Sequence, residues 1–579
     1  MIPPGAAEGR WLEHYDRGVP RTLEPYPNRT LLSYVRETAV QRPDHPALLF
    51  RGNRISYGEL ERLSDSFAAA LVSLGVARGD RVALILPNCP QFVITLVGAW
   101  KAGAVVAPLN PLYTPPELAE ALRCVGSNTV VALTRNYAAL KALQPETPVE
   151  SVIATNIKEY LPAEMRLLYT ATMEQARGDR VAIGPTDLRL QELLAENTHT
   201  SFAVPVTPDD SAVILMSGGA TGTPKGVVGL HGGLVAAGLQ GHAWFSPVLT
   251  DWVDVNMLPI PLFHVLGIGA LAGSLVGRNP LALVPDPRDL TDLLQTIREV
   301  RPALLFGVPA LFAAVLARHD VQAGKVNLRS IKICFSGAAP LLAETKKRFE
   351  KATGGRIVEG YSCTEAMFAC TASPALGAHK IGSVGLPLPD VEVRIADVGP
   401  EELATRAVGE IWLRAPQVML RYWENPEETR LAFRNDELGK AWLCTGDLGY
   451  LDKDGYLFIV DRKKDLIKTS GYQVWPREIE EVIASDPAVA EVAVGGVPHA
   501  QKGEVAQAWV VLRDGANAEE AETRTFCRDR LAPYKMPVGV EFRSTLPKAA
   551  AGKLADDAGV EGSGSTSATR SSRSSRVGL

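Results

Sequence analysis

The spacing of apolar residues switches repeatedly along the chain between a helical and a strand-like period. Five apolar residues recur at helical spacing: Leu60, Leu63, Phe67, Leu71 and Leu74. The unbroken apolar run RVALIL (81–86) then predicts a buried strand. QFVITLVGAWKAG predicts a helix, and further strands are predicted at 104–109, 211–216, 281–284, 303–308 and 331–337. Such alternation is typical of α/β proteins with largely parallel sheets.

The pattern changes after residue 400. GEIWLRAP and DGYLFIV predict an antiparallel β-module within 401–460, and the charged DRKKDLIK (461–468) predicts a linker. Beyond it, Pro476 opens an amphipathic helix, and AVAEVAVGGV and QAWVVL predict strands of an α+β unit. The Ser-rich end has few large aliphatic residues and is predicted to be disordered. The predicted organisation is an N-terminal domain of parallel-sheet subdomains plus the β-module at 1–460, a hinge at 461–464, a small mobile C-terminal domain at 465–555 and a tail at 556–579.

Composition and charge narrow the class of protein. The 579 residues are 46% hydrophobic and 22% charged, which is typical of globular domains. The 60 basic and 65 acidic residues leave a net charge of −5. The sequence shows no basic domain, so we expect no nucleic-acid partner. Seven scattered cysteines without a C-x-x-C pair favour a reducing compartment over a disulfide framework or a zinc site.

Targeting signals are also absent from the pattern. The start MIPPGAAEGRWLEHYD has no basic segment followed by an apolar one, so we expect no signal peptide. Residues 91–109 come nearest to the about 20 apolar residues that cross a bilayer, but Lys101 interrupts them. We therefore expect a cytoplasmic protein.

The strongest local signal is the Gly-rich stretch MSGGATGTPKG (216–226), directly after a predicted strand. Backbone N–H groups of such a loop can converge on phosphate oxygens, with Lys225 as a point charge. In isolation, an ordinary turn with a solvated lysine is an equal alternative. The stretch matches neither the Walker A pattern nor G-x-G-x-x-G.

This stretch resembles the phosphate-binding signature of the adenylate-forming superfamily of acyl-CoA synthetases, luciferases and adenylation domains. The other motifs of that superfamily follow in order: PLFHVLG (261–267), SGAAPL (336–341), EGYSCTE (359–365), WLCTGDLGY (442–450), DRKKDLIKTSGYQVWPREIEEV (461–482) and LPKAAAGK (546–553). The resemblance covers residues 25 to 554. DRKK and the stretch NIKEYLPAEMRLLY (156–169) are similar to bacterial long-chain fatty acid–CoA ligases.

The resemblance implies a reaction in two steps. A fatty acid and ATP form acyl-AMP and pyrophosphate, and CoA then displaces AMP to give acyl-CoA. ATP, Mg²⁺ and CoA are the cofactors and co-substrates that this implies. The substrate carboxylate is itself the nucleophile, so the protein has to position the reactants and neutralise charge.

The same resemblance assigns roles to individual residues. The phosphate loop would comprise Ser217, Gly218, Gly219, Thr221, Gly222, Thr223 and Lys225. Residues around adenine would be Gly337, Ala338, Ala339, Gly360, Tyr361 and Ser362, with Tyr361 stacking on the ring. Thr364 would bond a phosphate oxygen, and Glu365 would hold Mg²⁺. Asp447 would bind the ribose hydroxyls, and Arg462 would add a cation beside them.

Further roles concern catalysis and CoA. Lys553 would bridge the carboxylate and the α-phosphate, and His264 would lie beside the acyl carboxylate. Small residues after it would leave room for an apolar chain: Gly267, Gly269, Ala270 and Gly273. Lys464 would sit at the hinge, with Lys468 and Gly471 toward CoA. Taken singly, His264 or Tyr361 is more typical of a core residue, and Asp447 of a turn.

Two departures from the superfamily pattern keep alternatives open. Ala220 replaces the usual threonine of the phosphate loop, and the sequence after Leu554 lacks the usual basic segment. The alternatives are another acid–CoA ligase or an acyl-AMP ligase of the superfamily, or a catalytically impaired acyl- or nucleotide-binding homologue. Peripheral contact at the inner membrane face and a homodimer also stay open.

Overall fold

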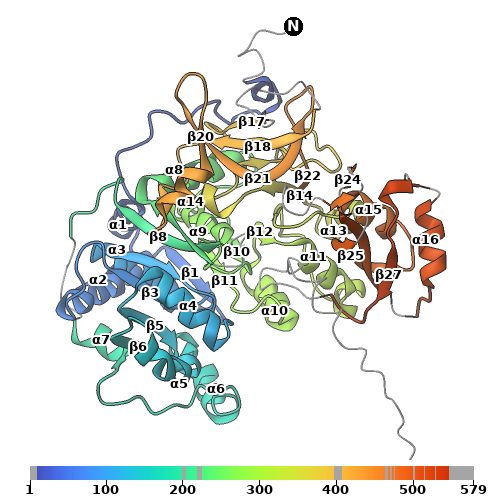
Figure 1. The fold of residues 1–579 in the computed structure, drawn as a ribbon. Coiled ribbons are helices and arrows are strands. Elements are labelled where there is room, and N and C mark those ends of the chain that lie inside the picture. Colours follow the sequence, from blue (N-terminus) through green and yellow to red (C-terminus); the bar gives the residue numbers. More distant parts are fainter. Residues whose placement is uncertain are drawn as a thin grey trace, which may run out of the picture. The chain divides into compact units, whose positions relative to one another are not determined.

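The computed structural model describes residues 9–197, 204–217, 224–396, 407–462, 467–469, 472–474, 476–499, 503–513, 515–528, 530–531 and 533–546. The chain divides into two compact units, Met1–Ile459 and Val460–Leu579 (Figure 1). Each unit has a hydrophobic core of its own.

The first large sheet of the N-terminal unit is mostly parallel. Its strand order is β16 (Leu386–Pro387), β15 (Thr371–Ala372), β14 (Arg356–Tyr361), β13 (Ile333–Ser336), β12 (Leu304–Gly307), β10 (Asn256–Leu258), β11 (Leu281–Leu283), β1 (Pro46–Phe50) and β2 (Asn53–Ser56). Helices α10 (Leu290–Val300), α11 (Pro309–Ala317) and α13 (Ala343–Thr353) pack on one face. Helices α8 (His231–Phe245) and α9 (Val265–Gly277) pack on the other.

The second large sheet is parallel in its centre and antiparallel at one edge. Its order is β19 (Arg421–Tyr422), β9 (Lys225–Leu230), β8 (Ser211–Ser217), β4 (Val105–Pro108), β3 (Arg81–Ile85), β5 (Thr129–Leu133), β6 (Ser151–Thr155) and β7 (Leu188–Arg189). Helices α4 (Pro115–Val125) and α5 (Thr134–Leu143) cover one face. Helices α2 (Tyr57–Ser73), α3 (Pro90–Lys101) and α7 (Leu190–Glu196) belong to the core on the other.

A smaller antiparallel sheet completes the N-terminal unit. It contains β17 (Glu392–Ala396), β18 (Gly409–Arg414), β21 (Ala441–Leu451), β20 (Phe433–Asn435) and β22 (Leu457–Arg462), the last of which pairs with β21. Helix α14 (Pro426–Ala432) precedes β20, and Asn425 caps it by accepting a hydrogen bond from the Glu428 N–H.

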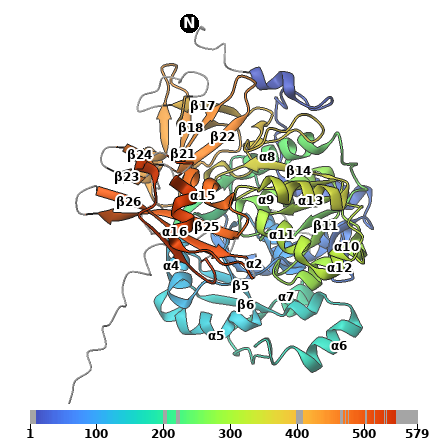
Figure 2. The same ribbon diagram turned by 90° about the vertical axis from the view of Figure 1, so that its right-hand side faces the viewer.

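The C-terminal unit is an α+β domain. Its sheet contains β24 (Tyr472–Val474), β23 (Ile467–Thr469), β26 (Gly503–Leu512), β25 (Val489–His499) and β27 (Gly539–Phe542). Helices α15 (Pro476–Ala484) and α16 (Glu520–Arg528) pack against this sheet (Figure 2). Their buried side chains include Ile479, Ile483 and Cys527.

The predicted fold class is confirmed: the chain is α/β, with parallel-sheet subdomains and a β-module ahead of a smaller α+β domain. The predicted strands at 81–86, 104–109, 211–216 and 303–308 correspond to β3, β4, β8 and β12. The apolar run interrupted by Lys101 is divided between α3 and β4. Among the described residues, no helix is long and apolar enough to cross a membrane.

Candidate active site

Two predicted motifs meet where neighbouring parallel strands end. Strands β13 and β14 pair with Ser336 opposite Glu359, so the residues that follow each strand lie at the same sheet edge. In α/β proteins, ligands bind at the carboxyl ends of such strands. Ala338 adopts a left-handed backbone conformation with φ of 74°, and it is exposed. The turn after β13 therefore presents exposed backbone and small side chains.

Packing around Gly360 leaves no room for a side chain. A Cβ at this position would lie 2.4 Å from Phe335 Cζ and 2.9 Å from the Thr371 carbonyl oxygen. A Cβ at Gly337, in contrast, would meet its nearest atom at an ordinary 3.6 Å. Gly360 thus allows β14 to pass close to the Phe335 ring, and this sets the backbone position of Tyr361.

Tyr361 and Asp447 are brought together from two different sheets. The Tyr361 hydroxyl donates to Asp447 Oδ2 at 2.5 Å. The Asp447 N–H donates to Thr445 Oγ1 at 3.1 Å, which orients the turn that carries the carboxylate. Burial and the negative charge of Asp447 raise the pKa of Tyr361 well above its usual value, so the phenol stays neutral. The residues predicted for adenine and ribose are therefore adjacent.

A second cluster joins the end of the phosphate loop to the predicted metal ligand. The Tyr422 hydroxyl donates to Glu365 Oε1 at 2.9 Å. Lys225 Nζ donates to Glu428 Oε2 at 2.7 Å and lies 5.4 Å from the centre of the Tyr422 ring. Pairing of β19 with β9, with Tyr422 opposite Val227, brings these distant segments together. Lys225 and Glu365 consequently flank one buried tyrosine.

Tyr422 and Glu428 were not predicted from the sequence. Both lie in RYWENPEE (421–428), which is outside the motifs that carried the resemblance. Burial and the nearby charge of Glu365 raise the pKa of Tyr422, so it remains a hydrogen-bond donor. The local sequence shows only an aromatic residue followed by acidic residues in the first turn of a helix. The role of both residues depends on strand pairing between distant segments, which the local sequence does not reveal.

The donor set fits Mg²⁺ shared with a nucleotide. Among the described residues, no group of three or more His, Cys, Asp or Glu side chains could enclose a metal ion. Mg²⁺ is usually held by one or two carboxylates together with substrate phosphates. Glu365, at η4 (Thr364–Ala366), provides one such carboxylate, and Tyr422 orients it.

The remaining described candidates occupy defined turns. His264 stands at the N-cap of α9, with its backbone N–H donating to the Pro261 carbonyl. Ser217 ends β8 directly opposite Lys225, the first residue of the antiparallel neighbour β9. Thr364 opens η4. The Ser362 hydroxyl donates to the Phe368 carbonyl, which gives this serine a structural role in its turn.

Several predicted residues lie outside the described part: Gly218, Gly219, Thr221, Gly222, Thr223, Lys464, Gly471 and Lys553. Arg462 ends β22 and Lys468 lies in β23, where the structure describes their backbone only. Their roles remain predictions.

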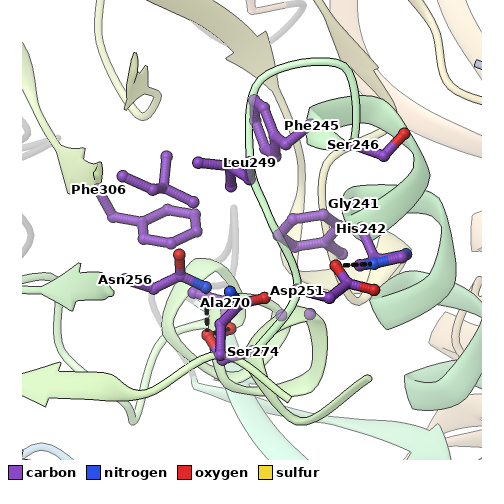
Figure 3. Close-up of a pocket in the computed structure, with 15 residues that line it drawn as sticks. Gly241, His242, Phe245, Ser246, Leu249, Asp251, Asn256, Ala270, Ser274 and Phe306 are labelled. Atoms are coloured by element: carbon purple, nitrogen blue, oxygen red, sulfur yellow. Dashed lines mark hydrogen bonds and ion pairs between the residues drawn. The ribbon is translucent and has the colours of Figure 1, made fainter. Parts of the chain in front are cut away.

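A pocket that is partly open to solvent lies among α8, α9, β10 and β12 (Figure 3). Gly269, Ala270 and Gly273 line it, as three of the four small residues after His264. Gly267 serves a different purpose, because its Cβ would lie 2.1 Å from the Pro261 carbonyl oxygen. Phe368 also lines the pocket, and it follows closely on the motif that carries Tyr361.

Comparisons with known proteins agree with these motifs. The family model of the AMP-binding enzyme matches residues 35–423, and that of the AMP-binding enzyme C-terminal domain matches 478–553. A long-chain-fatty-acid–CoA ligase of Bacillus subtilis (strain 168) is 37% identical over 94% of this chain and 96% of its own.

Two solved structures share the fold. ATP-bound MatB from Rhodopseudomonas palustris superposes with a TM-score of 0.76 at 29% identity, over 91% of this chain and 97% of its own. The anthranilate CoA ligase AuaEII, in complex with anthranoyl-AMP, has a TM-score of 0.79 at 24% identity, over 91% of this chain and 96% of its own.

Proposed function

The chain belongs to the AMP-binding enzyme family, and from this premise we propose that it is a long-chain fatty acid–CoA ligase. It activates a fatty acid with ATP, releasing pyrophosphate, and transfers the acyl group to CoA, releasing AMP. The match to the Bacillus subtilis ligase carries the proposal, because it extends over both units at 37% identity. The two side-chain clusters support it.

The Tyr361–Asp447 pair would hold the nucleoside. Tyr361 is neutral and partly buried, so its ring can stack on adenine while its hydroxyl orients Asp447. An ionised carboxylate accepts hydrogen bonds from both ribose hydroxyls. Together they fix the α-phosphate relative to the sheet edge, and this positioning lowers the barrier for attack by the fatty acid carboxylate.

The Lys225–Tyr422–Glu365 cluster would bind the charged end of ATP. Lys225 offers a cation to the phosphates, and Glu365, oriented by Tyr422, would hold Mg²⁺. The metal would neutralise phosphate charge as pyrophosphate departs. Glu428 accepts a hydrogen bond from the Lys225 ammonium at 2.7 Å. The carboxylate thereby keeps a partly buried cation in position beside Tyr422.

The pocket between α8 and α9 would take the acyl chain. His264 stands at the N-cap of α9, and Gly269, Ala270 and Gly273 of the same helix line the pocket. Phe245, Leu249, Phe306 and Phe368 supply an apolar lining. Burying each methylene of the acyl chain there contributes about 0.8 kcal/mol to binding.

The acyl-adenylate would then meet CoA after the C-terminal domain turns at the hinge. We assign the hinge to 461–464, close to the boundary between the two units at Ile459 and Val460. Rotation there would withdraw Lys553 and bring Lys468 and Gly471 toward CoA. Such hinge motions are common where two half-reactions share one site.

The function is tested by incubating the purified protein with palmitate, ATP, Mg²⁺ and CoA. The expected products are palmitoyl-CoA, AMP and pyrophosphate in equal amounts. Pyrophosphate without a thioester would indicate an acyl-AMP ligase, and neither product would indicate a binding homologue. A panel of aryl acids and shorter fatty acids separates the long-chain ligase from other acid–CoA ligases.

We further propose a cytoplasmic protein that contacts the membrane surface peripherally. Helix α6 (Ala163–Thr172) exposes Leu167 and Leu168 at 73% and 63% of their surfaces. Exposed leucines on a surface helix can enter the headgroup region of a bilayer, where long-chain acids also partition. Flotation with anionic vesicles tests this, and recovery of both the parent protein and a Leu167→Ser, Leu168→Ser variant in the vesicle-free fraction would contradict it.

A further inference from the structure

One wall of the acyl pocket carries an amide oxygen that lacks a hydrogen-bond donor. Asn256, the first residue of β10, is 4% exposed and lines the pocket. No described residue donates a hydrogen bond to its Oδ1 atom. A buried acceptor without a donor is unfavourable, and a ligand or an ordered water can supply the missing hydrogen bond.

The hydrogen bonds around Asn256 fix the orientation of its amide. Asn256 Nδ2 donates to Ser274 Oγ at 2.9 Å. The Ser274 hydroxyl donates its only hydrogen to the Ala270 carbonyl at 2.8 Å, so toward Asn256 it can only accept. The amide nitrogen must therefore face Ser274. Figure 3 shows the amide oxygen on the opposite side, directed toward Phe306.

The surroundings of this oxygen are apolar. Leu304 lies opposite Asn256 on the neighbouring strand β12, and Phe306 follows it on the same face. The other polar side chains that line the pocket have partners of their own: His242 and Asp251 are joined at 2.8 Å. The Ser246 hydroxyl donates to the Ala243 carbonyl at 2.9 Å, and the Asn279 amide nitrogen donates to the Thr250 carbonyl at 3.0 Å. A hydroxyl that enters the apolar part of the pocket therefore has Asn256 Oδ1 as an acceptor that is not already engaged.

The position along α9 sets where a substrate hydroxyl would have to be. Ser274, the partner of Asn256, lies about 15 Å along the helix axis from His264, at 1.5 Å per residue. This is comparable to the extended distance between the carboxyl carbon of ricinoleate and its hydroxyl-bearing carbon. A hydroxyl at the far end of a long chain would lie beyond Asn256.

We propose that the pocket selects long-chain acids that carry a hydroxyl in the middle of the chain, and that Asn256 Oδ1 accepts the hydrogen bond from this hydroxyl. The proposal rests on the proposed function, since it assigns the pocket to the acyl chain. Ser274 is then a positioning residue, because it holds the amide with its oxygen toward the substrate.

The test compares two matched pairs of acids. Ricinoleate and oleate differ by the mid-chain hydroxyl, and ω-hydroxypalmitate and palmitate differ by a terminal one. In an Asn256→Leu variant, the ratio of kcat/KM for ricinoleate to that for oleate should fall by about tenfold. The ratio for the second pair should stay unchanged. An unchanged ricinoleate-to-oleate ratio would overturn the proposal and leave water as the partner of Asn256.

Two further variants separate the hydrogen bond from pocket shape. Leu304→Met alters the shape beside Asn256 without a polar change, so both acids should be affected alike. Ser274→Ala leaves the amide in place but frees it to rotate, and should lower the ratio by a smaller factor than Asn256→Leu. An equal fall of the ratio in Leu304→Met would contradict a hydrogen bond as the cause.

A binding measurement keeps this test independent of turnover. Calorimetric titration of ricinoleate and oleate into the full-length protein reads the same preference without ATP or CoA. If no acid yields a thioester, the proposed function fails. Tighter binding of ricinoleate that is lost in Asn256→Leu would still support the role of Asn256, and equal binding of both acids would refute it.

Discussion

A larger side chain in place of Gly273 should fill part of the acyl pocket and shorten the fatty acid that the enzyme accepts. A Cβ at this position would meet only the Gly238 carbonyl oxygen, at 3.8 Å, so a larger side chain can extend into the pocket without a clash at its base. Leucine is also a better helix former than glycine. Gly273→Leu therefore occupies space for about four methylene groups, which are worth about 3 kcal/mol of acyl-chain burial at about 0.8 kcal/mol each.

The measured quantity is kcat/KM for palmitate relative to octanoate. A loss of about 3 kcal/mol corresponds to a fall of about a hundredfold in that ratio for Gly273→Leu. Gly273→Ala is the matched control, because one methyl group at 3.8 Å makes only ordinary contact, and its ratio should change by less than about fourfold. A palmitate-to-octanoate ratio that is the same in Gly273→Leu and the parent enzyme would refute the assignment of the pocket to the acyl chain.

Three further predictions concern the nucleotide site, the hinge and the fold. Tyr422→Phe removes the donor to Glu365 and should raise the KM for ATP at saturating Mg²⁺ by about tenfold; an unchanged KM would contradict it. Lys464→Pro should spare acyl-adenylate formation and impair thioester formation, and equal loss of both half-reactions would refute the hinge. Burial lowers the pKa of His231 from 6.5 to about 4, so protons bind the unfolded chain more tightly and stability is lost as the pH falls below 6.5. Between pH 7 and pH 5 the loss is about 2 kcal/mol. A His231→Gln variant should lack this part of the acid destabilisation in urea unfolding, and identical pH profiles would contradict it.

Buried parallel strands were predictable because both faces of such strands are apolar. The runs RVALIL and ALLFGV contain β3 and β12. Strands that are buried on both faces appear in a sequence as nearly continuous apolar runs, so these two were recognisable. The start of α15 at Pro476 could also be predicted from the local sequence, since proline is favoured in the first helical turn. The order of strands within the sheets depends on contacts between distant segments, and local periodicity carries no information about it.

Charged residues show the same limit of local reasoning. Lys101 interrupts an apolar run, yet its side chain is 1% exposed and binds Glu61 at 2.8 Å and Asp65 at 2.7 Å from α2. From the sequence pattern alone, Glu61 and Asp65 would be placed on the polar face of a helix. Only the packing of α2 against α3 makes them partners of a buried ammonium group.

The candidate site was predictable as a set of motifs but not as a set of contacts. The motif residues Tyr361 and Asp447 were expected at one nucleotide, and the structure joins them by a hydrogen bond. Tyr422, which links Glu365 to Lys225, was missed because its role arises from the pairing of β19 with β9. Asn256 could not be recognised either, because an unpaired amide oxygen is a property of packing.

A single-turnover experiment tests the central claim most directly. The protein is mixed with labelled palmitate, ATP and Mg²⁺ without CoA, and CoA is added after a delay. The two-step account predicts that protein-bound palmitoyl-AMP accumulates first and converts to palmitoyl-CoA when CoA arrives. Absence of palmitoyl-AMP before CoA, or its persistence after CoA, would contradict the account.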